Sequence, residues 1–341
     1  MSIIIINSLK YKIGKMIKKK QLWFFFVALI SHLFLFISSA ISNENNDIKS
    51  REFIVNLAYG NGWASQGGEM NWGSYQVSFG EKIADNFFAS VVYLNEGHPN
   101  NNHRDGFAVI GTGVVDFNQR VKLDFSLGPY FSMNTTHRNK QIYNDKRVGI
   151  YGSVAFIYYL IPDGFFLKAQ YNHVQMLNSF TTDSVMVGIG ANFQNELPSS
   201  FSAKDMQISY WLGTSQTNRS KLPLKMGHQL EFKHFINDAA AYSVSYLYEG
   251  DNGLVNRQGV VGQIWYLMPI STDWELSAGI GPYYNYDRHE PKNKNDFAGV
   301  ISLQINYQLV KHLSTNFRFN RVVSFNDKDQ DMFMAGIAWN F

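Results

Sequence analysis

The sequence predicts an all-β protein that folds as a transmembrane antiparallel up-and-down β-barrel. Of its 341 residues, 45% are hydrophobic and 17% are charged. These are too few charges for a disordered chain, and the average is too polar for a bundle of membrane helices. Along most of the chain apolar residues recur at every second position, and short connections alternate with longer ones. An apolar outer face, short turns at one end and long loops at the other explain both patterns.

The first forty residues have the features of a secretory signal peptide. Residues 10–20 contain six lysines, residues 22–37 form an apolar run, and Ser38-Ser39-Ala40 follows. This order predicts export with cleavage after Ala40. A single membrane anchor is the alternative, but the run is shorter than the ~20 residues that a span needs. Removing the six positive charges changes the formal net charge from +3 to −3, so the main argument for a nucleic-acid partner disappears.

Residues 121–130 (VKLDFSLGPY) illustrate the alternation, with Lys122, Asp124 and Ser126 between apolar neighbours. A soluble sandwich alternates in the same way, but aromatic residues such as Tyr93 and Tyr307 near strand ends suit the interfacial girdles of a membrane barrel. The chain has no Cys, so an exported fold must hold together without disulfides. A closed sheet does this, because it pairs every backbone group inside the protein.

The chain contains two copies of one unit. Residues 93–97 (YLNEG) match 246–250 (YLYEG) at an offset of 153, and GPY recurs at the same offset. After the third loop the offset becomes 148 and pairs the Asn-Phe at 192–193 with that at 340–341. Each copy supplies eight candidate strands. They lie near residues 52–60, 72–82, 87–96, 106–117, 121–131, 148–160, 165–175 and 184–193, and then near 205–214, 227–236, 240–249, 259–268, 274–284, 297–309, 313–323 and 332–341.

These repeats suggest a signal peptide at 1–40, a first eight-stranded repeat at 41–193, a periplasmic linker at 194–205 and a second repeat at 206–341. Two architectures follow: two tandem eight-stranded barrels with filled interiors, or one sixteen-stranded barrel around a water channel. Charges of both signs beside small residues favour two barrels, and the single barrel stays open as the alternative. The charged positions expected inside are Lys122, Asp124, Lys168, Glu275 and Arg318.

A pair of opposite charges recurs at the same place in both copies. Glu96 and Arg104 flank the connection between the third and fourth strands of the first copy, and Glu249 and Arg257 take these places in the second. We therefore expect a structural ion pair that holds the loop in each barrel.

Four residues remain as candidates for chemistry. His98, His103 and Asp105 could form a metal or acid–base cluster, but the second copy lacks both histidines. His173 lies on the predicted lipid face, where an acyl hydrolase would place a His–Ser dyad. Gln175 occupies the position where such a dyad needs its Ser. We therefore predict no catalytic residue, and the absence of a phosphate-binding loop or paired metal motif predicts no cofactor and no metal.

Across nearly all of the mature chain, the sequence resembles bacterial outer-membrane β-barrel proteins. Phe341, preceded on the same face by Trp339, resembles their C-terminal assembly signature. The segments YLNEGH…HRDGF and GPY are similar to those of an uncharacterised proteobacterial group with no assigned activity. The resemblance implies a Gram-negative outer membrane and handling by the barrel assembly machinery. A weaker similarity to lipid A deacylase-type barrels stops at the strand count, because their active-site pattern is not matched.

Together these features predict a non-enzymatic integral outer-membrane protein with a structural or surface-interaction role. The alternatives are a porin-like passive channel for small solutes and an acyl hydrolase of lipid A or phospholipid. Expected partners are outer-membrane lipid, lipopolysaccharide and the barrel assembly machinery, with no nucleic acid.

Overall fold

The computed structural model describes residues 51–65, 73–97, 102–138, 141–195, 205–217, 222–290 and 295–341. The predicted signal peptide with its cleavage site at Ala40 lies outside these residues, as does His98. In the described part of the chain, no helix is long and apolar enough to cross a membrane.

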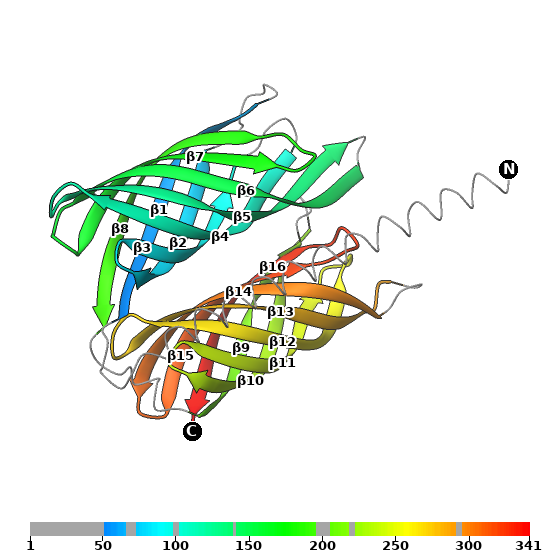
Figure 1. Ribbon diagram of the computed structural model, residues 1–341. Coiled ribbons are helices and arrows are strands. Elements are labelled where there is room, and N and C mark those ends of the chain that lie inside the picture. Colours follow the sequence, from blue (N-terminus) through cyan, green and yellow to red (C-terminus); the bar gives the residue numbers. More distant parts are fainter. Residues whose placement is uncertain are drawn as a thin grey trace. The chain divides into compact units, whose positions relative to one another are not determined.

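Eight strands form the first closed barrel, coloured blue to green in Figure 1. They are β1 (Arg51–Ala64), β2 (Ser74–Ala84), β3 (Phe87–Asn95), β4 (Asn102–Asp116), β5 (Val121–Arg138), β6 (Gln141–Tyr159), β7 (Phe165–Met176) and β8 (Thr182–Asn195). Each strand pairs antiparallel with the next, and β8 pairs with β1 from Arg51↔Asn195 to Ala64↔Thr182. This closure leaves no free sheet edge.

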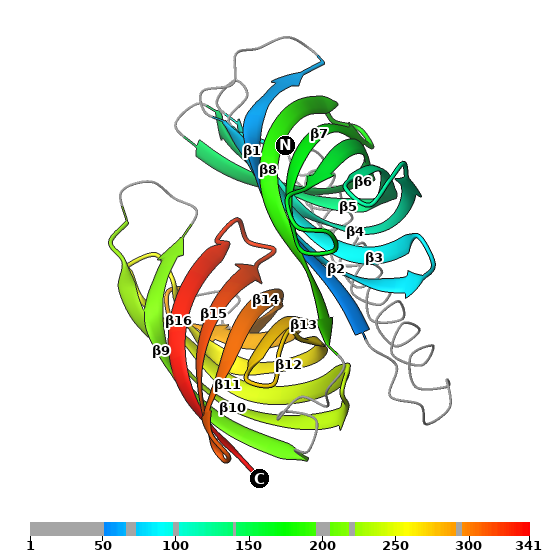
Figure 2. The same cartoon turned by 90° about the vertical axis from the view of Figure 1, so that its left-hand side faces the viewer.

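Eight further strands form the second closed barrel, coloured yellow-green to red in Figure 2. They are β9 (Met206–Thr217), β10 (Lys225–Asn237), β11 (Ala240–Asp251), β12 (Asn256–Pro269), β13 (Trp274–Asp287), β14 (Asn295–Val310), β15 (Leu313–Val323) and β16 (Gln330–Asn340). Here β16 pairs with β9, from Gln330↔Thr217 to Asn340↔Gln207. Sixteen strands in two tandem barrels were predicted, and this is confirmed. The alternative of one sixteen-stranded barrel is wrong, because β8 pairs with β1.

The connections define two ends of each barrel. Short turns, such as residues 85–86 and 160–164 in the first barrel and 238–239 in the second, lie at one end, which we call the turn end. Asn86 and Asp163 adopt positive φ there (57° and 53°), a backbone shape that Asn and Asp tolerate in tight turns. The connections β1–β2, β3–β4, β5–β6 and β7–β8, with their counterparts in the second barrel, define the loop end.

One segment differs from the sequence-based expectation. The connection between the strands predicted at 121–131 and 148–160 is expected to be a long loop, but β5 and β6 stay paired through it up to Arg138↔Gln141. The stretch is polar on both faces and so lacks the alternation that marks a strand. It pairs nonetheless because backbone bonds continue along it, and the Thr135 hydroxyl donates to Asn144 Oδ1 across the hairpin (3.0 Å).

The two faces of the barrel walls differ in polarity. On β8, Val185, Val187 and Ile189 are 53–67% exposed on the outside, while Ser184 and Met186 are buried inside. The same division holds on the other strands, with large apolar side chains outside and most buried polar side chains inside. A soluble barrel has the opposite arrangement, and a barrel that spans a lipid bilayer requires this one.

Candidate functional site

A buried ion pair closes the loop end of the first barrel. Glu96 follows β3, and Arg104 lies opposite it on β4, held there by the bond from the Glu96 N–H to the Arg104 carbonyl (2.9 Å). The Arg104 guanidinium donates to both carboxylate oxygens of Glu96, with Nε–Oε1 at 2.9 Å and Nη2–Oε2 at 2.6 Å. The side chains are only 1% and 3% exposed. Such two-point contacts between charged groups are among the strongest hydrogen bonds in proteins.

Arg104 also spans the lumen to the β7–β8 connection. Its guanidinium donates to the Phe180 carbonyl (2.7 Å) and the Thr182 hydroxyl (2.8 Å) and lies over the Phe180 ring, 4.1 Å from the centroid. From β5, the Tyr130 hydroxyl donates to Glu96 Oε1 (2.7 Å). Glu96, Arg104, Tyr130 and Thr182 therefore tie opposite walls of the barrel together, and we call them the first plug.

The second barrel repeats this arrangement. Arg257 donates to both oxygens of Glu249, at 2.9 and 2.7 Å, and both side chains are fully buried. The same guanidinium reaches the Lys328 carbonyl in the β15–β16 connection (2.9 Å). Tyr283, the counterpart of the tyrosine in the first plug, is also fully buried. Glu249, Arg257 and Tyr283 form the second plug.

In each plug a serine hydroxyl donates a hydrogen bond to the carbonyl of the glutamate. The serine lies on the second strand of the first barrel but on the first strand of the second barrel. Ser74 on β2 donates to the Glu96 carbonyl (3.0 Å), whereas Ser215 on β9 donates to the Glu249 carbonyl. The β1 position that corresponds to Ser215 is Gly62, where an added Cβ would meet Ser74 Oγ at 2.9 Å. The same carbonyl is therefore satisfied in both barrels by different residues.

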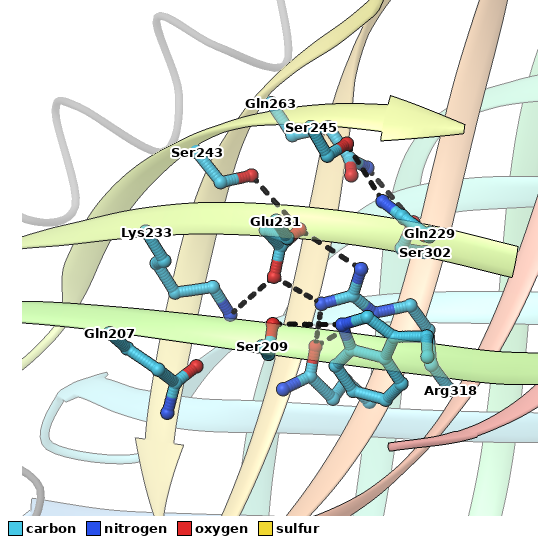
Figure 3. A network of polar contacts seen from close by, with 12 residues as sticks. Gln207, Ser209, Gln229, Glu231, Lys233, Ser243, Ser245, Gln263, Ser302 and Arg318 are labelled. Carbon is cyan, nitrogen blue, oxygen red and sulfur yellow. Dashed lines mark hydrogen bonds and ion pairs between the residues drawn. The ribbon is translucent and has the colours of Figure 1, made fainter. Parts of the chain in front are cut away.

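A second charged layer fills the middle of the second barrel, as Figure 3 shows. Arg318 donates to both oxygens of Glu231 (2.9 and 2.6 Å), and Lys233 Nζ lies 4.0 Å from Glu231 Oε1. Both cations are capped by indole rings. Arg318 lies 3.9 Å from the Trp211 centroid, and Lys233 lies 3.9 Å from that of Trp265. We call these five residues the charged core.

The two indoles of the charged core are fixed by hydrogen bonds and by close packing. Trp211 Nε1 donates to Ser209, and Trp265 Nε1 donates to Ser243, both at 2.8 Å. Each ring lies against a glycine on the neighbouring strand, where an added Cβ would approach it to 2.6–2.7 Å. These contacts leave the rings no room to swing aside.

The middle of the first barrel holds a neutral network instead. The Tyr151 hydroxyl donates to Asn172 Oδ1 (2.7 Å) and accepts from Gln170 Nε2 (2.8 Å), and Asn172 Nδ2 donates to Gln76 Oε1 (3.2 Å). All four side chains are buried. We call Gln76, Tyr151, Gln170 and Asn172 the amide layer, and it closes the lumen below the first plug.

The structure places the five charged residues predicted for the interior as follows. Asp124 is buried, and Lys122 and Lys168 line the same interior cavity towards the turn end. Glu275 is buried and accepts from Asn306 Nδ2 (2.6 Å), while Arg318 belongs to the charged core.

Of the histidine candidates near the third loop, the structure describes His103, which lies on β4 beside Asp105. His103 contacts Asn95 Nδ2 (3.0 Å) and lies 3.9 Å from Asp105, which accepts from the Tyr93 hydroxyl (2.9 Å). Among the residues that the structure describes, no group of three or more His, Cys, Asp or Glu side chains could hold a metal ion.

His173 lies on the outer face of β7, in contact with Asp183 of β8 (Nδ1–Oδ1 2.8 Å). The Tyr171 hydroxyl donates to the same oxygen (2.5 Å). In the second barrel the corresponding pair is Arg321 and Asp331, at 3.5 Å. A cross-strand pair of a basic and an acidic residue therefore recurs in both copies, which is a common way to stabilise neighbouring strands.

Further hydrogen bonds join the loops of the second barrel next to its plug. Asp251, the last residue of β11, accepts from His289 (2.8 Å) and from the Gly253 N–H (2.9 Å). These hydrogen bonds, that of His289 first, lower the pKa of Asp251 below its usual value.

Sequence reasoning missed several residues of the plugs and of the charged core. Tyr130 shares strand parity with Asp124, and GPY recurs in both copies, so its inward position could have been inferred. Thr182 gave no signal, because it meets Arg104 only when the barrel closes. Trp265 lies in an apolar run (IWYLM) that hides the alternation.

The two residues of the predicted assembly signature lie at the end of the chain. Trp339 is 51% exposed on the outer face of β16, and Phe341 is 57% exposed. The Phe341 N–H donates to the Met206 carbonyl (2.9 Å), so the chain end stays paired with the first strand of its barrel.

These features define a class of protein: a tandem pair of small antiparallel barrels, each with an apolar outer face and a polar interior blocked by buried side chains. No protein-family model matches the chain, and no curated protein does either. Solved structures of outer-membrane barrels resemble it at low identity.

The N-terminal β-barrel domain of Pseudomonas aeruginosa OprF is 16% identical, with a TM-score of 0.34, over 42% of this chain and 97% of that chain. Ail, the attachment invasion locus protein of Yersinia pestis, is 12% identical, with a TM-score of 0.34, over 42% and 98%. The monoaromatic hydrocarbon channel CymD is 9% identical, with a TM-score of 0.26, over 86% and 89%.

Proposed function

We propose that this protein is a non-enzymatic, integral outer-membrane protein with a structural or surface-interaction role. One observation carries the proposal: the lumen of each barrel is crossed at the loop end by a plug built on a buried Glu–Arg pair. The interior of an eight-stranded barrel is just wide enough for its own side chains. With a plug and a second polar layer in series, neither barrel offers a continuous path for solutes.

Opening a plug also requires a large free energy. Separating Glu96 from Arg104 leaves two buried charges without the two hydrogen bonds that join them. Breaking a buried ion pair costs about 3–5 kcal/mol. At the upper end of that range, thermal opening occurs in a few molecules per ten thousand, which is too rare for steady transport.

The proposed role at the surface depends on the loop end. We place it outside the cell, where anionic lipopolysaccharide would meet exposed basic residues such as Arg288. Insertion would proceed through the barrel assembly machinery, with Phe341 and Trp339 on the last strand as the recognised end. Lipid contacts the apolar outer face of both barrels.

Single-channel recording in planar bilayers tests the proposal, with refolded residues 41–341. Heat-modifiable migration on gels confirms that the sample is folded. We expect a silent bilayer. A large, steady, ohmic conductance from folded protein would instead assign a porin-like channel.

Incubation with lipopolysaccharide and phospholipid tests the enzymatic alternative. In the described residues His173 contacts Asp183 and no serine hydroxyl, so we expect intact lipid. Loss of an acyl chain that His173→Ala or His103→Ala abolishes would establish a hydrolase and overturn the proposal.

A further inference from the structure

The first barrel contains a cavity that opens at the turn end. The centres of water-sized molecules can occupy about 50 Å³ of it, which is room for one small molecule, and Lys82, Asn86 and Lys122 line it near the short turns. Its inner end is the amide layer, represented by Gln76 and Tyr151. Because this layer and the first plug lie beyond it, the cavity is a dead end rather than part of a channel.

The second copy shows what fills this space elsewhere. At the offset of 153, Thr112 in the cavity wall corresponds to Trp265, and Ala58 nearby corresponds to Trp211. These indoles and their two cations occupy the middle of the second barrel. The cavity thus results from two small residues at positions where the repeated unit also accommodates the largest side chain.

Two buried acceptors in the cavity wall lack a hydrogen-bond donor. Asp124 and Asn56 are each 5% exposed, and the Oδ1 atom of each has no partner in the described part of the chain. Lys168 lines the same cavity, and no direct ion pair joins it to Asp124 among the described residues. Asp124 and Lys168 therefore face one small space and attract each other across it, with Lys122 also nearby, but no direct hydrogen bond joins them among the described residues.

Buried charges without a direct hydrogen-bond partner are unfavourable, so a ligand that bonds to both gains affinity from them. A molecule with an ammonium group and a carboxylate meets this need, because the ammonium can donate to Asp124 and Asn56 while the carboxylate accepts from Lys168. The hydroxyls of Ser90 and Ser126 line the wall and add hydrogen bonds.

We propose that this cavity binds a small zwitterion of amino-acid size, which enters from the turn end. The site needs only that the turn end meets water. Binding in this cavity does not depend on any interaction made by the loop end. The inference therefore goes beyond the proposed function and does not rely on it.

Equilibrium dialysis of refolded residues 41–341 in detergent, with radiolabelled glycine and L-alanine, tests this site. We expect saturable binding of one molecule per chain, weakened at least tenfold by Asp124→Asn and by Lys168→Met. The counterparts of these residues in the second barrel supply matched controls, Ser277→Ala and Asn316→Ala, which are expected to leave the affinity unchanged.

A filling variant provides a second test that does not alter the charges. Thr112→Trp with Ser126→Gly copies the Trp265–Gly279 pairing of the second barrel into the first. We expect this variant to fold, as heat-modifiable migration will show, and to lose binding.

Three results would overturn the proposal. The first is no saturable binding to the folded wild type, which would mean a cavity that holds water only. The second is unchanged affinity in the Asp124→Asn or Lys168→Met variant. The third is equal binding of ethylamine or acetate, each of which carries one of the two charges. None of these results depends on conductance, so failure here leaves the proposed function standing.

Discussion

Arg104→Ala is the substitution that most directly tests the role of the plugs. It removes two charge-assisted bonds to Glu96, the bonds to the Phe180 carbonyl and the Thr182 hydroxyl, and the contact with the Phe180 ring. It also leaves the Glu96 carboxylate buried without its counter-charge. Loss of one partner of such a pair destabilises a protein by about 3–5 kcal/mol. We expect a loss of this size for the first barrel.

Urea unfolding of refolded residues 41–341 measures the loss, with Arg257→Ala as the matched variant. Arg257→Ala should destabilise the second barrel, whose unfolding is followed by the fluorescence of Trp211 and Trp265. Arg104→Ala should leave that transition in place. Bilayers should stay silent in both variants, because the amide layer and the charged core still block the two lumens.

The combined substitution of Glu96→Leu and Arg104→Met separates charge from packing. Replacing a whole buried pair by apolar residues is often neutral or stabilising, so we expect most of the stability to return. A loss below about 1 kcal/mol for Arg104→Ala, the range of an exposed pair, would refute the reasoning. So would a double variant that is as unstable as the single one.

Three further outcomes are expected. Glu231→Gln removes the carboxylate that Arg318 binds and that lies beside Lys233, so the second barrel should lose about 3–5 kcal/mol; a normal urea midpoint would contradict this. The lowered pKa of Asp251 means that its contribution is present above the usual Asp pKa of about 4 and is lost as pH falls through the lowered value. Asp251→Asn should therefore flatten the fall in stability below about pH 5, and an unchanged profile would exclude this contact as a cause. His173→Ala removes an exposed cross-strand partner and should cost at most about 1 kcal/mol in urea unfolding; a larger loss would mean that the pair with Asp183 carries more of the fold.

The sequence was most informative where one physical cause acts at every second residue. Lipid on one side and a packed polar interior on the other impose the alternation, so strands, faces and interior charges such as Asp124 and Arg318 could be predicted. The duplication then identified Glu96 and Arg104, because both copies carry them at the same offset, whereas His98 and His103 occur in the first copy alone.

The features that the sequence did not reveal depend on barrel closure and on the local packing of side chains. Thr182 meets Arg104 across 78 positions of chain, and only the β1–β8 seam brings them together. Trp265 faces inward among apolar neighbours, so its pattern resembles that of any buried run. The tip of the β5–β6 hairpin is polar on both sides, which removes the period that would have marked it as strand.

The serine that supports the plug lies on different strands in the two barrels. This difference limits which strands one copy could take from the other. A hybrid first barrel that took β1 from the second copy would bring Ser215 to the place of Gly62, where its Cβ would crowd the Ser74 hydroxyl at 2.9 Å. The opposite hybrid would have glycine on both strands, so the Glu249 carbonyl on β11 would lose its serine donor and keep only that from Gln330 Nε2 (3.2 Å). An exchange between the repeats therefore preserves the serine contact of each plug only when the first two strands move as one block.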